Sequence, residues 1–140
     1  MEIVLKRFSI KTKPRSDIIN ITEKVESCLK ETGLINGIVC VHNPGSTGSI
    51  STLEFEPGLV ISDVPEFMER IIPYNRNYGH HQTWGDHNGA GHLRSYLLKT
   101  SQTFPFSGGN LLLGSWEQIV FLEFDERSRN RRIDCQFIGE

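Results

Sequence analysis

The last third of the sequence consists of short strand-like segments separated by tight turns, and this pattern constrains the fold more than any other feature. Strand-favouring β-branched and aromatic residues are concentrated in the segments 103–106, 111–113, 118–124 and 133–138. Gly108 and Gly109 predict a hairpin turn between the first two segments. Because turns this short join antiparallel neighbours, we expect antiparallel strands here.

The earlier part of the chain predicts further strands. Apolar and polar residues alternate from Ile3 to Lys11, as they do in a half-buried strand. Residues 37–42 are apolar and rich in β-branched side chains, which is typical of a buried strand. Residues 43–48 are interpreted as a tight connection from that strand into a returning strand over 49–54.

Two main helices are predicted between these strands. Apolar residues recur at helical spacing from Ile21 to Leu29, and Gly33 is well placed to end that helix. A second helix is predicted over 63–72, with a proline in its first turn and Pro73 after its end. A shorter helix is predicted over 93–99. The pattern as a whole predicts an α+β fold dominated by antiparallel strands.

Length and charge narrow the class of protein. We expect a single domain over 1–140, because chains usually divide into several domains only well above this length. The chain has 15 basic and 17 acidic residues and a net charge of -2, which argues against a protein that coats nucleic acid. No apolar run approaches the roughly 20 residues that cross a bilayer, and the charged N-terminus does not resemble a signal peptide. The three cysteines form no CxxC pair. We therefore expect a cytoplasmic protein without a membrane partner.

The segment 74–92 is long, polar and rich in histidine. Four of the five histidines fall in it, and Asp86, Asn88 and Trp84 lie among them. Long segments of this kind are often functional, and neutral imidazole is the commonest transition-metal ligand. The segment therefore predicts a metal or catalytic role, although dense histidines can also be solvated surface groups.

Two other segments carry possible ligand-binding groups. Gly45-Ser46-Thr47-Gly48 offers backbone N–H groups and two hydroxyls to an anion, although a plain hairpin turn would use the same residues. Glu54 and Glu56 share one face if 49–54 is a strand, and with Asp63 they could bind a divalent cation or form a solvated rim.

The segment 127–132 is the only basic cluster, with four arginines in six residues. It could meet RNA or a phosphorylated ligand, but a solvated hairpin tip or a subunit contact is the favoured interpretation. Trp84 could line a pocket for a flat ligand, because it sits within a polar segment.

Four motifs occur in the order and spacing of one known family. They are Gly-Ser-Thr-Gly-Ser-Ile-Ser-Thr-Leu-Glu (45–54), Asn-Tyr-Gly-His (77–80), Asn-Gly-Ala-Gly-His-Leu-Arg-Ser (88–95) and Leu-Leu-Gly-Ser-Trp-Glu-Gln-Ile (112–119). Together they closely resemble the YjbQ-like proteins, which are often labelled secondary thiamine-phosphate synthases. The resemblance covers nearly the whole chain and implies a compact α+β fold with a β-sandwich-like core, assembled as a homotrimer.

The resemblance also implies a site. Its positions match His80, His92 and Glu54, which are expected to hold a divalent metal, either zinc or magnesium. Asn88 matches a position that is Asn or Asp in relatives, and Asp86 transfers less directly. His81 and His87 lie outside the shared pattern. In the bacterial branch a His-Thr pair stands where this chain has Gly45 and Ser46, so one imidazole of that branch is absent here, with His42 as a possible substitute.

The implied reaction joins a pyrimidine methyl diphosphate to a thiazole phosphate and releases pyrophosphate. In this interpretation the metal neutralises the leaving group, Ser46, Thr47 and Arg94 hold phosphate oxygens, and Trp84 stacks on the pyrimidine. Two alternatives stay open. One is metal-dependent hydrolysis of a small phosphorylated or amide compound, and the other is a non-enzymatic trimer that binds a metabolite or RNA.

Overall fold

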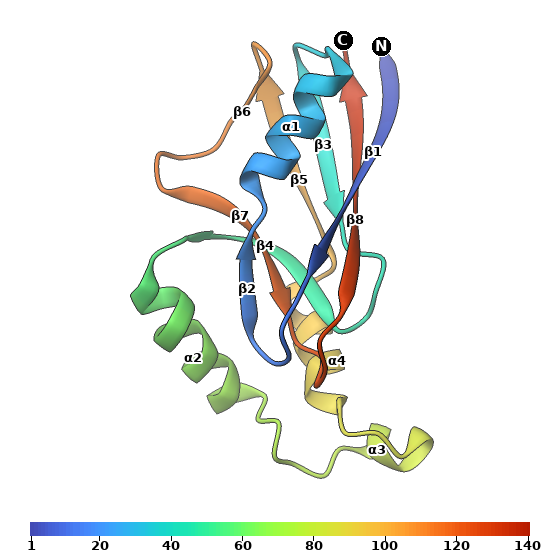
Figure 1. The fold of residues 1–140 in the computed structure, drawn as a ribbon, viewed down its shortest axis with the longest axis vertical. Helices are drawn as coiled ribbons and strands as arrows, with labels where there is room; N and C mark the ends of the chain where they lie inside the picture. The colour runs from blue at the N-terminus through green and yellow to red at the C-terminus, as the bar shows by residue number, and fades with distance from the viewer.

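The computed structural model describes all 140 residues and consists of two antiparallel sheets and four α-helices. Figure 1 shows α1 lying along the sheets, with α2, α3 and α4 toward the opposite end of the molecule. In chain order the elements are β1 (Glu2–Lys11), β2 (Asp17–Asn20), α1 (Thr22–Thr32), β3 (Gly37–His42), β4 (Gly48–Glu54), a π-helical turn (Gly58–Asp63), α2 (Val64–Ile71), α3 (Gly79–Trp84), α4 (Gly89–Leu98), β5 (Ser101–Ser107), β6 (Asn110–Leu111), β7 (Glu117–Glu123) and β8 (Asn130–Gly139).

The larger sheet has the strand order β1-β8-β3-β5-β6, and the smaller one has the order β2-β7-β4. All strand pairs are antiparallel. The main hydrophobic core unites residues from both sheets with the apolar face of α1, including Leu29, Val39, Ile50, Phe121 and Phe137. The α+β class with antiparallel strands is therefore confirmed.

Helix α1 begins and ends where its sequence predicts. The side chain of Asn20 accepts the backbone N–H of Thr22 at 3.1 Å, which satisfies one N–H at the helix start. At the other end Gly33 takes the left-handed conformation, with φ of 73°, and its N–H bonds the Lys30 carbonyl. The stripe of Val25, Cys28 and Leu29 is buried.

The prediction that β4 returns alongside β3 is wrong. β3 lies between β8 and β5 in the larger sheet, whereas β4 pairs only with β7 at the edge of the smaller sheet. The connection 43–47 therefore crosses from one sheet to the other. β3 is mostly apolar, whereas β4 mixes small polar residues with Ile50 and Leu53. Neither pattern specifies the partner of its strand, so the sequence could not distinguish a hairpin from a crossing.

The polar segment after Pro73 is also more regular than expected. It contains α3 and α4, and α4 begins at Gly89, four residues before the predicted helix start at 93. The residues Gly89-Ala90-Gly91 have weak helical signal, but they are buried against neighbouring backbone, which favours the helix through packing. A Cβ at Gly91 would lie 2.4 Å from the Phe124 carbonyl oxygen, so only glycine fits there. The structure has four α-helices, not two main ones.

No helix is long and apolar enough to cross a membrane.

Candidate functional site

Helices α3 and α4 bring two of the predicted site residues together. The ring centroids of His80, near the start of α3, and His92, in the first turn of α4, lie 4.4 Å apart. Both side chains are partly buried. Two imidazoles this close disfavour a state in which both are protonated, so the pair is suited to hold one proton and to pass it on.

Hydrogen bonds fix the orientation of His80. Asp125 is a carboxylate that can only accept, so the Asn88 amide nitrogen that faces it at 3.5 Å is the donor. The Asn88 oxygen then faces His80 Nε2, at 3.1 Å. His80 Nε2 must therefore carry a proton, which it donates to the Asn88 oxygen. The chain Asp125–Asn88–His80 holds the imidazole in one tautomer, as outer residues do in many catalytic sites.

Asp86 adds negative charge beside the same nitrogen. Its Oδ1 lies 3.3 Å from His80 Nε2, within ion-pair distance. The same oxygen is buried and has no hydrogen-bond partner, so the ion-pair contact with His80 is the interaction it makes. A buried carboxylate oxygen without a donor costs free energy, and a positive charge on the imidazole pair would offset that cost.

The surroundings of His92 disfavour its protonated form. Burial lowers its pKa below the ordinary 6.5, and positive charge on His80 lowers it further. Asp125, Asp86 and a hydrogen bond with the Ser46 backbone oppose this shift without cancelling it. His92 is therefore neutral near pH 7 and can accept a proton.

A cavity of about 280 Å³ opens beside His92. Ser46, Ser95, Tyr96 and Lys99 line it together with the imidazole. Ser46 is exposed, and Lys99 supplies a positive charge at the cavity wall. The structure thus brings Ser46 and His92 to one cavity, in which a small anion could reach both an imidazole and an ammonium group.

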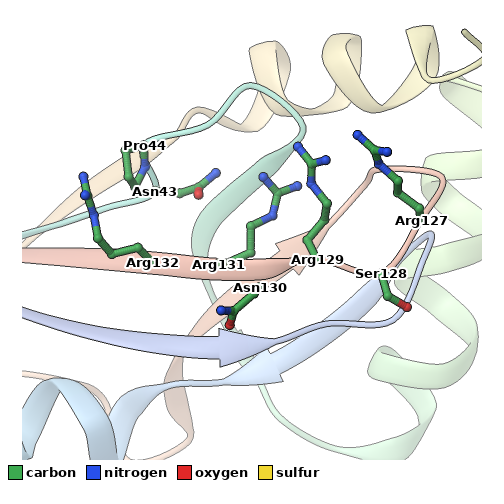
Figure 2. Close-up of a pocket in the computed structure, with 8 residues that line it drawn as sticks. All are labelled: Asn43, Pro44, Arg127, Ser128, Arg129, Asn130, Arg131 and Arg132. Carbon is green, nitrogen blue, oxygen red and sulfur yellow. The ribbon is translucent and has the colours of Figure 1, made fainter.

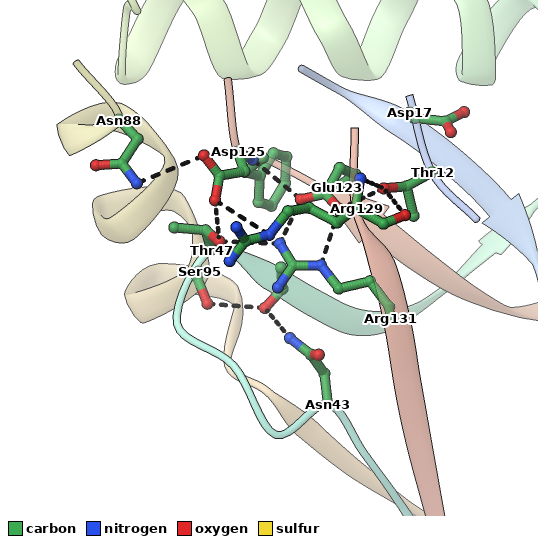
Figure 3. A network of polar contacts seen from close by, with 12 residues as sticks. Thr12, Asp17, Asn43, Thr47, Asn88, Ser95, Glu123, Asp125, Arg129 and Arg131 are labelled. Atoms are coloured by element: carbon green, nitrogen blue, oxygen red, sulfur yellow. Dashed lines mark hydrogen bonds and ion pairs between the residues drawn. The ribbon is translucent and has the colours of Figure 1, made fainter. Parts of the chain in front are cut away.

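Thr47, the other predicted anion-binding residue, is buried, and its hydroxyl already has hydrogen-bond partners within the protein. Its hydroxyl donates to Asp125 Oδ2 at 3.0 Å and accepts from Arg131 at 2.9 Å. Figure 3 shows this network of Thr47, Asp125, Glu123 and Arg131 between α4 and the strands. Thr47 therefore acts as a structural link rather than as a free donor to a ligand.

Sequence reasoning missed the residues at the centre of this network. Glu123 is the last residue of β7 and Asp125 lies two residues beyond it. Both are almost fully buried, although acidic side chains at a strand end ordinarily point to solvent. The signal that could have found them is their alternation, Glu123-Phe124-Asp125, directly after the apolar run 119–122 of β7. Two acids continuing a buried strand require buried partners, and the arginine-rich segment 127–132 is the only nearby source.

The Arg94 side chain lies inside the protein and not at the wall of the cavity beside His92. Its side chain is completely buried and makes four hydrogen bonds, to Ser16, to Glu69 and twice to the Ile72 carbonyl. The guanidinium also lies 4.1 Å from the centroid of the Tyr74 ring. Arg94 therefore connects α4 with α2 and with the β1–β2 connection through its hydrogen bonds.

Glu54 is not brought to the histidines within one chain. It is exposed at the far end of β4, six residues from Gly48, whose carbonyl accepts the Ser95 hydroxyl of α4. Six strand residues extend about 20 Å. No group of three or more His, Cys, Asp or Glu side chains is arranged to hold a metal ion. The chain's own residues therefore do not fit the expected Glu54–His80–His92 metal site.

The remaining aromatic and histidine candidates are not members of the pair, although His81 packs edge-on against His80. Trp84 ends α3, is 76% exposed and does not line the cavity beside His92. His81 has a structural contact, because its Nε2 accepts the N–H of Gly89 at 3.0 Å at the start of α4. His87 packs edge-on against His81. His42 ends β3, where it pairs with Asp134 and Ser101 across the sheet.

Comparison with known proteins places this arrangement in a family. A family model described as UPF0047 protein YjbQ-like matches residues 6–140. A UPF0047 protein from Archaeoglobus fulgidus is 40% identical over 126 residues, which are 90% of this chain and 94% of that protein.

Solved structures agree with the sequence comparison. A hypothetical protein from Aeropyrum pernix K1 is 32% identical and superposes with a TM-score of 0.90 over 100% of both chains. A YbjQ-like protein of unknown function from Sulfolobus solfataricus is 27% identical, with a TM-score of 0.87 over 99% of this chain and 100% of that one. The chain therefore belongs to the YjbQ-like UPF0047 family.

Proposed function

We propose that the chain is an enzyme that acts on a small phosphorylated substrate, with the His80–His92 pair as its proton-transfer group. The reaction suggested by the family resemblance is of the thiamine-phosphate-synthase type, in which a pyrimidine methyl diphosphate and a thiazole phosphate combine and pyrophosphate leaves. The observation that carries the proposal is the close imidazole pair, held by Asp86 and Asn88 beside a cavity with a lysine.

The proton chemistry of the pair suits this reaction. When the carbon–oxygen bond to the diphosphate breaks, the electron pair stays on the diphosphate oxygen, and the thiazole nitrogen forms the new bond to carbon. The leaving pyrophosphate then takes up a proton. One protonated imidazole beside a neutral one can supply it, because Asp86 stabilises positive charge on the pair.

The groups around the cavity supply anion binding. Lys99 offers a charged donor to phosphate oxygens, and the exposed Ser46 offers a hydroxyl. Thr47, Arg94 and Trp84 have no part in this proposal, because the first two are committed elsewhere and the third is exposed. No step is assigned to a divalent metal, because the chain's own side chains do not assemble a site for one.

The expected homotrimer gives Glu54 a possible route to the site. Phe55 and Trp116, close to the Glu54–Glu117 pair at the end of the β4–β7 ladder, are exposed by 41% and 75%. Exposed aromatic side chains of this kind are common in subunit interfaces. We propose that a second copy of the chain covers this region, and that Glu54 reaches a histidine pair only across such an interface.

Hydrolysis is the second candidate, and the lowered pKa of His92 favours it. A neutral imidazole can take a proton from water, which would then attack a phosphate or an amide carbon. The same residues serve both reactions, so only the products distinguish them.

The experiment is a pair of assays on the purified protein. The first measures thiamine phosphate made from the two precursors, and the second measures phosphate or pyrophosphate released from each precursor alone. We expect product only when both precursors are present, and its loss by about 10²-fold or more in His80→Ala and His92→Ala, the typical effect of removing a general acid or base.

His87→Ala is the matched control, because His87 is an exposed histidine of the same segment without contact to the pair. It should retain the parent rate. Full activity of His80→Ala would overturn the proposal, and release from one precursor alone would favour the hydrolase.

A further inference from the structure

A second cavity, of about 600 Å³, lies where the start of β8 passes the β3–β4 connection. Arg127, Arg129, Arg131 and Arg132 line it from one side and Asn43 from the other, and no hydrophobic residue takes part. It shares no lining residue with the cavity beside His92. It is therefore a separate place on the molecule, which the function proposed above does not use.

The arginines converge because of their spacing. Residues two apart on an extended chain place their side chains on the same face. Figure 2 shows the guanidinium groups of Arg127, Arg129 and Arg131 on one side of the backbone, while Ser128 and Asn130 point to the other side. The regular alternation in the segment 127–131 thus produces one guanidinium-lined wall rather than a scattered basic surface.

Carboxylates pair with these arginines and fix their positions, but they do not cancel the whole positive charge of the guanidinium groups. Three of the four arginines each have one carboxylate within ion-pair distance, in the pairs Arg129–Asp125, Arg131–Glu123 and Arg132–Asp134. Arg127 is exposed and has no carboxylate within that distance. The cavity therefore keeps a positive charge in a chain whose net charge is negative.

Two of the paired arginines also keep free N–H groups. Arg129 meets Asp125 through Nε alone, at 3.6 Å, and its side chain is 34% exposed. The buried Arg131 uses Nε and one terminal nitrogen for Glu123 and Thr47, and its other terminal nitrogen faces Gly45 of the β3–β4 connection. Donors from several guanidiniums thus point toward one polar hollow.

We propose that this cavity binds a small anion with two linked phosphate groups, of the inorganic pyrophosphate class. Guanidinium groups bind phosphate oxygens through paired, charge-assisted hydrogen bonds, and successive arginines can each take one phosphate group. The absence of aromatic or apolar lining disfavours a nucleotide or a single nucleic-acid strand, whose bases stack on such side chains. The inference does not rest on the proposed reaction, because binding at this wall needs no turnover.

Calorimetric titration of the full chain with inorganic pyrophosphate at low ionic strength tests the proposal. Arg127→Ala is the informative variant, because Arg127 contributes no ion pair to the fold. Arg70→Ala is its control: Arg70 is an exposed arginine of α2 without an ion pair, and its loss changes the net charge equally. We expect Arg127→Ala to weaken binding by about tenfold, the size of one charged hydrogen bond, and Arg70→Ala to leave it unchanged.

His92→Ala should bind pyrophosphate as the parent does, which separates this cavity from the one beside the histidines.

Several results would overturn the proposal. They are equal weakening by Arg127→Ala and Arg70→Ala, loss of binding in His92→Ala, or no measurable binding by the parent. An oligonucleotide that binds through Arg127 and resists competition by pyrophosphate would identify a nucleic-acid surface instead. A change of oligomeric state in Arg127→Ala would identify a subunit contact.

Discussion

Glu123 and Arg131 form a buried ion pair across the turn between β7 and β8, with Arg131 Nε 2.8 Å from Glu123 Oε1. Since β7 belongs to the smaller sheet and β8 to the larger one, this pair joins the two sheets at the point where the chain passes between them. The hydroxyl of Thr12, just beyond β1, also donates to Glu123, at 2.6 Å. The pair is thus the centre of a buried polar network that links the two sheets.

Glu123→Gln should destabilise the fold strongly. Removing one member of a buried ion pair leaves the other charge buried without compensation, which costs about 3–5 kcal/mol. Arg7→Ala is the control, because Arg7 and Asp134 form a pair in which the arginine is 54% exposed, and such pairs contribute about 1 kcal/mol or less. Denaturant unfolding of both variants measures the difference, and similar losses would contradict the structural role of the buried pair.

The titration of His92 should respond to its neighbours with opposite signs. Burial lowers the pKa of His92 most, and positive charge on His80 lowers it further. His80→Gln should therefore raise that pKa, because it removes the neighbouring positive charge. Asp125→Asn should lower it further, since the negative charge of Asp125 raises it. NMR titration of the imidazole signals follows each change, and shifts of the same sign in both variants would be inconsistent with this geometry.

Asp125 should make stability depend on acid pH. Burial alone would raise its pKa, but donors from the Glu126 backbone, Thr47 and Asn88, together with the charge of Arg129, outweigh burial and hold the pKa below the ordinary 3.8. The unfolded chain then binds the proton more readily than the folded one. The stabilisation is therefore complete above about pH 4 and is lost as the pH falls below 3.8 toward the folded pKa.

Comparison of the parent with Asp125→Asn isolates this contribution. The difference between their free energies of unfolding should shrink as the pH falls from 5 to 2.5, because protonation makes the two side chains more alike. Thermal or denaturant unfolding across that range measures it. A difference that stays constant with pH would show that the carboxylate is not specifically stabilised.

The close approach of α4 to β7 predicts a sharp contrast between two glycines. A Cβ at Gly91 would lie 2.4 Å from the Phe124 carbonyl oxygen, which is backbone and cannot move aside easily. Gly91→Ala should therefore cost about 1–3 kcal/mol, the usual range for overpacking. Gly114→Ala is the control, because its Cβ would meet only Glu117 at 3.7 Å, an ordinary contact. Equal stability of the two variants would refute the predicted clash.

The sequence predicted the elements whose signals are local. The alternation from Ile3 to Lys11, the apolar stripe of α1 and the glycine turn at 108–109 each correspond to an element in the structure, because these patterns depend on neighbouring residues. Strand partners could not be predicted in the same way. Neither the apolar β3 nor the mixed β4 carries a signal for its partner, and the choice of sheet depends on long-range packing such as the close approach of Gly48 to Phe121.

The same distinction holds for the site. His80 and His92 lie twelve positions apart on helices that the sequence showed only weakly, so the family resemblance supplied their pairing. The burial of Arg94 and Thr47 had no local signal, because arginine and threonine are ordinarily exposed and these two acquire their partners only in the fold. Residue type indicated that these side chains could bind an anion, but only their partners in the fold show that the Thr47 donor is already used and that Arg94 is enclosed by its own hydrogen bonds.

Glu54 and His80 offer the last test, because they can serve one reaction only if they come from different copies of the chain. Glu54 is exposed at the far end of β4, and no metal-binding group of three side chains forms within one chain.

We expect Glu54→Gln and His80→Ala to be inactive separately, in the thiamine phosphate assay. When the two proteins are unfolded together and refolded as a mixture, trimers that contain both should regain part of the parent rate, because some interfaces combine an intact Glu54 with an intact His80. Mixing the two folded proteins without unfolding is the control, and it should restore less of the parent rate. If Glu54→Gln alone is fully active, Glu54 lies outside the site; if the refolded mixture stays inactive, the two residues are not shared between copies.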